Sequence, residues 1–163
     1  MKKILVLSFV IFAFSAAMFA QATTQATATA TIVIPMTITK TVDLNFGSIV
    51  PNTGGTVVIT PAGARSATGT VVLFGGVVSA ASFNVTGSGT STYAITLPTT
   101  DHTITSGGNT MTVNNFQSNP SGTGALVGGA QTLTVGATLN VGSGQAVGTY
   151  TNAAGFDVTV NYN

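Results

Sequence analysis

Few side chains in this sequence could carry out catalysis. The 163 residues include one histidine, three acidic residues and no cysteine. Only Asp101 stands next to the histidine, His102; the other two acidic residues are Asp43 and Asp157. A Ser-His-Asp triad needs a carboxylate that orients the imidazole from a separate position, together with an oxyanion site. Adjacent residues do not supply that arrangement, and we expect Asp101 and His102 to be solvated in a loop after Pro98.

The same scarcity limits metal and cofactor chemistry. Zinc sites use cysteine and histidine, and calcium loops need several closely spaced oxygen ligands. Glycoside hydrolysis needs two neighbouring carboxyl groups, whereas the three aspartates are widely spaced. The glycine-rich run at 142–148 has neither the spacing nor the following helix of a dinucleotide loop. We therefore expect no catalytic residue, no metal site and no cofactor, and predict that the protein is not an enzyme.

The first 22 residues resemble a secretory signal peptide. Two lysines precede the apolar run 4–14, and the small-x-small sequence at 20–22 fits a cleavage site. The bonds after Ala17 and Ala20 fit as well. The apolar run is too short to span a bilayer, and no later stretch is long enough to do so. We expect an exported protein whose mature chain begins near residue 23 and has no transmembrane segment.

The mature chain has very little charge. Its two fixed cations, Lys40 and Arg65, face three aspartates. Two cations are too few to neutralise a row of phosphates or to form a polybasic membrane anchor, so we exclude nucleic acid as a partner. Charged residues make up 4% of the sequence, where about a quarter is usual. Strand edges without protective charges are either hidden in an assembly or prone to aggregate.

Alternation of apolar and polar residues predicts short strands along the whole mature chain. The clearest pattern covers 133–141, where every second residue is apolar, and turns rich in glycine and asparagine separate the runs. This spacing is typical of an antiparallel sandwich or barrel, and we predict an all-β antiparallel β-sandwich. The other expected runs are 42–46, 57–59, 70–74, 81–85, 93–97 and 111–113.

The two ends of the mature chain have strand-like patterns of their own. We predict a β arm at residues 23–34, after which Pro35 interrupts the ladder because it lacks an N–H. The arm is either the first strand of the domain at 35–163 or a strand that pairs with another subunit. The apolar face of the arm is Ala26, Ala28, Ala30, Ile32 and Ile34; that of the terminal strand is Phe156, Val158, Val160 and Tyr162.

The order of these segments resembles a bacterial family catalogued as domain of unknown function 4402. The resemblance runs from "ATATIVIPMTITKTVDLNFGSIVP" through "SAASFNVTG", "YAITLP", "MTVNNF" and "LTVGATLNV" to "GTYTNAAGFDVTVNYN". More distantly, residues 44–47 and 148–150 before the alternating final strand are similar to spore coat protein U-like subunits and archaic chaperone–usher pilins. This second resemblance implies an immunoglobulin-like sandwich that lacks one strand and is completed by strand exchange.

The resemblance to pilins also implies roles for both ends. The final strand would border the open groove, and the arm of a neighbouring subunit would fill that groove as a donor strand. The partners would be copies of the chain or sister subunits, with a periplasmic chaperone and an outer-membrane usher before assembly. The protein would pass through the periplasm and become a structural subunit of a fimbria-like fibre or coat at the cell surface.

Two other readings remain open. A complete sandwich that uses 26–34 as its own first strand would stay monomeric. A monomeric secreted binding module, an adhesin or a carbohydrate-binding domain, would need exposed aromatic side chains. The sequence has no tryptophan, and Tyr93, Tyr150 and Tyr162 all occupy strand-like positions, which gives this alternative little support.

Overall fold

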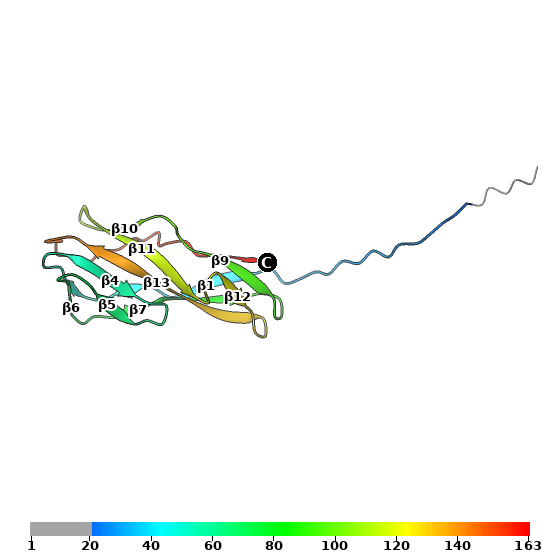
Figure 1. Ribbon diagram of the computed structural model, residues 1–163, viewed down its shortest axis with the longest axis horizontal. Coiled ribbons are helices and arrows are strands. Elements are labelled where there is room, and N and C mark those ends of the chain that lie inside the picture. Colours follow the sequence, from blue (N-terminus) through cyan, green and yellow to red (C-terminus); the bar gives the residue numbers. More distant parts are fainter. Residues whose placement is uncertain (1–20) are drawn as a thin grey trace, which may run out of the picture. The chain divides into compact units, whose positions relative to one another are not determined.

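The computed structural model describes residues 21–163, so the expected signal peptide, apart from its last two residues, lies outside the described part of the chain. The described residues form strands β1 to β14 and no helix. Every pairing between these strands is antiparallel. The predicted all-β fold is confirmed, with antiparallel sheets arranged as in a β-sandwich (Figure 1). Within residues 21–163, no helix is long and apolar enough to cross a membrane.

The larger sheet has seven strands in the order β1-β8-β13-β11-β10, with β4 beside β13 and β5 beside β4. Its centre is β13, which pairs with β8 along its first half, with β4 along its second half and with β11 on the opposite edge. The bounds are β1 (Thr37–Val42), β4 (Gly55–Ile59), β5 (Arg65–Ala67), β8 (Ala81–Thr86), β10 (His102–Ser106), β11 (Asn109–Asn119) and β13 (Ala130–Val141).

The remaining strands form three small sheets. One has the order β12-β9-β14, and the others are the pairs β2-β7 and β3-β6. Because each is only two or three strands wide, the core face of the larger sheet is covered in separate pieces. The bounds are β2 (Asn45–Phe46), β3 (Ile49–Val50), β6 (Val72–Leu73), β7 (Val78–Ser79), β9 (Thr92–Thr96), β12 (Thr123–Ala125) and β14 (Thr159–Tyr162).

The core lies on the apolar face of β13, as the alternation predicts. Its five apolar residues between 133 and 141 are at most 7% exposed. They divide between two buried clusters, one around Tyr93 and Leu126 and the other around Val57 and Val71. Leu44 and Phe116 pack against both clusters and join them.

A glycine in β13 lets the neighbouring strand approach closely. A Cβ atom on Gly136 would overlap the carbonyl oxygen of Ile59, and that backbone is held in the ladder between β4 and β13. We expect Gly136→Ala to lower the free energy of unfolding by about 1–3 kcal/mol, as other overpacking substitutions do. Gly142→Ala is the control, because its Cβ would meet only the end of the Gln145 side chain, at 3.0 Å. Urea unfolding measures both, and equal losses would contradict the clash.

Some expected runs differ from the observed strands. The run 70–74 forms only the two-residue strand β6; Val71 just before it is buried, and Phe74 just after it is 71% exposed. No strand occurs between residues 21 and 36, and all side chains from 21 to 35 are exposed. The backbone divides into two units, with the domain proper at Val33–Asn163. The arm at 23–34 thus has a strand-like sequence but no strand pairing in the described chain.

Candidate functional site

A groove of about 1200 Å³ opens on the core side of the larger sheet. Its floor is apolar and comes from β8, β10, β11 and β13. One wall is β1 with β2, and the other is the segment 145–158 that leads into β14. Both walls are therefore built next to edge strands, because β1 ends the larger sheet and β14 ends the three-stranded one. The floor residues are Ala81, Phe83, Ile104, Met111, Val113, Leu139 and Val141, and five of the seven are at most 8% exposed.

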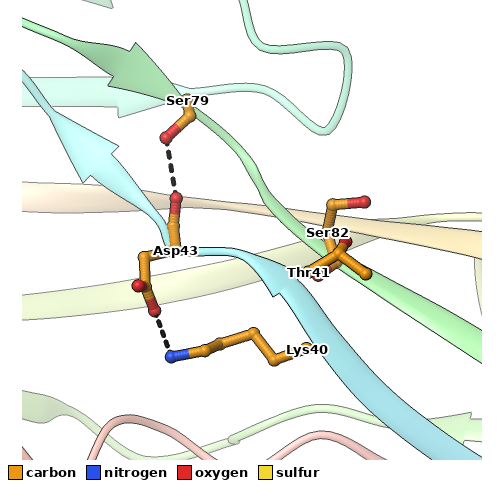
Figure 2. Close-up of polar contacts among 5 residues, drawn as sticks. All are labelled: Lys40, Thr41, Asp43, Ser79 and Ser82. Carbon is orange, nitrogen blue, oxygen red and sulfur yellow. Dashed lines mark hydrogen bonds and ion pairs between the residues drawn. The ribbon is translucent and has the colours of Figure 1, made fainter.

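The β1 wall bends where the chain leaves the larger sheet for β2 (Figure 2). The Ser79 hydroxyl donates to the carbonyl oxygen of Asp43 (2.7 Å), and the Thr41 hydroxyl donates to that of Ser82 (3.0 Å). Lys40 and Asp43 also form an ion pair, with side chains 57% and 77% exposed. Exposed pairs contribute at most about 1 kcal/mol, so the bonds to backbone oxygens do more to hold the bend.

The opposite wall is long and has little regular structure. Thr151 exchanges two backbone hydrogen bonds of 3.0 Å with Thr105 on the edge strand β10. Gln145 donates from Nε2 to the Tyr150 hydroxyl (2.8 Å), which in turn donates to the carbonyl oxygen of Ala146 (2.8 Å). The only other backbone bond within 145–158 closes a turn from the N–H of Gly155 to the carbonyl oxygen of Asn152, so side-chain bonds supply much of the attachment of this wall.

The terminal strand alternates as its sequence predicts. Phe156, Val158, Val160 and Tyr162 are half-buried, and the residues between them are exposed. Only 159–162 pair with β9, so the segment before them runs past the end of that ladder. Phe156 and Val158 line the groove, whereas Val160 and Tyr162 lie further along β14 and are absent from its lining. The Phe156 ring packs on Phe116, with centroids 4.8 Å apart.

Asp101 and His102 have separate partners. Asp101 is exposed and accepts a hydrogen bond from Asn114 (3.1 Å). His102 is the first residue of β10 rather than part of a loop, so that expectation is wrong; its Nε2 lies 3.0 Å from Nδ2 of Asn152. A smaller pocket of about 330 Å³ lies beside His102 and Asp157. Among residues 21–163, no three histidine, cysteine or acidic side chains come together as metal ligands would.

Local patterns point to only part of this groove. The alternation places Phe156, Val158, Val160 and Tyr162 on one face, and only the resemblance to pilins assigns that face to a groove; neither indicates the β1 wall or the floor. A strand such as β11 alternates in the same way whether its apolar face is covered or left open to a groove. The missing information is which strands end each sheet, and that depends on pairings between distant segments such as β1 with β8.

The comparisons with known proteins concern the domain without its arm. Searches among curated proteins and among solved structures found no significant match. A family model described as a domain of unknown function (DUF4402) matches residues 36–162, which run from the residue before β1 to the end of β14. Because the match covers more than half of the chain, this protein belongs to the DUF4402 family.

Proposed function

We propose that this protein is a structural subunit of a bacterial cell-surface fibre or coat, in which the arm of one subunit fills the groove of the next. The observation that carries the proposal is a groove with an apolar floor between two edge strands, in a chain whose strand-like arm has no strand pairing of its own. The distant similarity to spore coat protein U-like subunits and archaic pilins points the same way, as does the signal-like N-terminus.

The chemistry of the arm suits such a groove. An incoming extended segment can add to a free sheet edge through its main chain, while alternate side chains enter the apolar slot. The arm at 23–34 has no charged residue, so no ion has to leave water. Its apolar face, from Ala26 to Ile34, would point at the floor, and its threonine face would point outward. The completed sandwich would then be immunoglobulin-like.

The arm and the groove are different surfaces, which favours an open chain of subunits. An interface between unlike surfaces is heterologous, and it propagates into a filament unless the rotation between subunits closes a ring. Each subunit would donate one arm and accept another. The partners are therefore further copies of this chain or sister subunits with a matching arm. A periplasmic chaperone that covers the groove and an outer-membrane usher are partners that we infer from the resemblance to pilins.

A charge on the donor face tests the proposal directly. The mature chain, residues 23–163, is expected to form polymers whose size rises with concentration in light scattering and which resist SDS without heating. Ala28→Asp is expected to raise the concentration needed for assembly about 100-fold, because an unpaired carboxylate would be buried in the groove. Thr29→Asp places the same charge on the outward face and is expected to assemble normally.

The contrary result is a mature chain that stays monomeric at every concentration. The fibre would then be excluded, and a monomeric binding module would be left. Equal loss of assembly in Ala28→Asp and Thr29→Asp would also count against the proposal, because the effect would then be one of charge rather than of the face that enters the groove.

A further inference from the structure

One side chain ties the root of the arm to the terminal strand. The Tyr162 hydroxyl donates to the carbonyl oxygen of Ile34 (2.7 Å) and accepts from the backbone N–H of Ser88 (2.6 Å). Ile34 belongs to the unit that contains the domain, and Ser88 lies in the turn between β8 and β9. We call this contact among Tyr162, Ile34 and Ser88 the clasp. It joins the start of the domain, a turn and the end of β14 through one oxygen atom.

The residues around the clasp fix the position of the Tyr162 hydroxyl. A Cβ atom on Gly87 would overlap that hydroxyl, so the turn accepts the tyrosine only because residue 87 is glycine. Tyr162 pairs with Tyr93 in the ladder, and the next residue, Asn163, donates from its side chain to the Thr92 hydroxyl (3.1 Å). The strand is thus held on both sides of the tyrosine, and the hydroxyl uses its donor and an acceptor position together.

The strand directions place the start of β1 and the end of β14 at the same end of the domain. β1 starts at Thr37 opposite Thr86 of β8, and β14 ends at Tyr162 opposite Tyr93 of β9. Because β8 and β9 are joined by the short turn that contains Ser88, both points lie at the same end of the domain. To enter the groove of its own chain, the arm would have to reverse at Pro35 and run back along β1 as a hairpin.

The clasp opposes that reversal. A β-turn over residues 34–37 would be closed by a hydrogen bond from the N–H of Thr37 to the carbonyl oxygen of Ile34. The Tyr162 hydroxyl donates to the same carbonyl oxygen; it takes one of the two acceptor positions and fixes the direction of the carbonyl toward the end of β14. We propose that Tyr162 is a positioning residue that favours exchange of arms between subunits over insertion of an arm into its own groove. This inference rests on the proposed function and adds a selection between two routes of insertion.

Introduced cysteines can distinguish insertion of an arm into the groove of its own chain from exchange between chains, because the native chain has no cysteine. We would place one cysteine at Ala26, Ala28 or Ala30 in turn and a second at Val158, in the full mature chain, and oxidise. Insertion within a chain gives a cross-linked monomer, and exchange gives a ladder on a non-reducing gel. Tyr162→Phe keeps the ring and removes the clasp. The ratio of cross-linked monomer to ladder is expected to rise about fivefold, as for the loss of one hydrogen bond.

Two further variants separate the clasp from general stability. Tyr93→Phe removes another buried hydroxyl, one that donates to Gln131 (2.7 Å), and is expected to leave the ratio unchanged. Gly87→Ala displaces the Tyr162 hydroxyl from the other side and is expected to shift the ratio in the same direction as Tyr162→Phe. If Tyr162→Phe does not fold, the Gly87→Ala variant alone tests the clasp.

The cross-linking results separate failure of the clasp from failure of the proposed function. Ladders with the same ratio in Tyr162→Phe and Gly87→Ala as in the parent would overturn the clasp and leave the fibre intact. Cross-linked monomers that already dominate with Tyr162 present would overturn the clasp and weigh against exchange. If no arm position forms a disulfide of either kind, the arm does not enter any groove, and both the clasp and the proposed function fail.

Discussion

Val158→Asp is expected to leave a chain that can donate its arm but can no longer accept one. Val158 is half-buried and lines the groove next to Phe156, so a carboxylate there would face the incoming strand without a partner. Assembly of the pure variant should require about 100-fold more protein than that of the parent chain. Thr159→Asp carries the same charge on the exposed face of the same segment and should assemble like the parent.

A mixture of the Ala28→Asp and Val158→Asp variants tests whether arm and groove engage each other. Ala28→Asp chains should accept but not donate, and Val158→Asp chains should donate but not accept. Each is expected to be monomeric alone, and an equimolar mixture is expected to stop at a 1:1 dimer. Light scattering coupled to size exclusion measures the mass. Monomers in the mixture would show that the arm and groove do not engage, whereas polymers would show that one charge is tolerated.

Tyr93→Ala is expected to cost about 3–5 kcal/mol of unfolding free energy, a large share of the 5–15 kcal/mol typical of a domain. The side chain is fully buried, and its ring fills the space above Gly124 on the neighbouring strand. Its hydroxyl donates to Oε1 of Gln131, which also accepts from the N–H of Ala125 (3.0 Å). Tyr93→Phe should lose only about 1 kcal/mol, because packing is kept and one hydrogen bond is lost.

The same residue adds a dependence on alkaline pH. Burial raises the pKa of Tyr93 above its ordinary value of 10.0, so the folded chain holds this proton more tightly than the unfolded chain. Its contribution is therefore complete below pH 10 and is lost as the pH rises through the folded-state pKa. Urea unfolding measured from about pH 8 to well above the ordinary tyrosine value should show a smaller decline for Tyr93→Phe than for the parent. Parallel declines would assign the effect to other groups.

Local alternation of apolar and polar residues identifies strands that have one buried face and one exposed face. It placed the apolar residues of β13 on one buried face, and Phe83 and Val85 on the core side of β8. It was less accurate where strands end and the chain bends: Val42 at the end of β1 is 44% exposed, and Phe74 after β6 is 71% exposed. At such points the backbone turns out of the sheet, so alternation in the sequence no longer predicts which face of the sheet a side chain lies on.

The groove shows the other limit of local patterns. Phe156 and Val158 belong to an alternating segment, so their shared face could be expected from the pattern, whereas a groove beside that face was implied only by the resemblance to pilins. The β1 wall requires that β1 pair on one side only, and the floor requires that residues of β8, β10, β11 and β13 come together on one face. These are properties of the whole arrangement of strands. Tyr162 illustrates this point too, because its alternation says nothing about the carbonyl oxygen of Ile34 that its hydroxyl reaches.

The central position of β13 has a consequence for how fast the domain forms. This strand pairs with β4, with β8 and with β11, so the sheet is not closed until segments from much earlier in the chain have reached it. Folding rates fall as contacts become more distant along the chain. The domain is therefore expected to fold slowly, and its sheet edges, which carry few charges, stay open to aggregation until β13 has gained its partners.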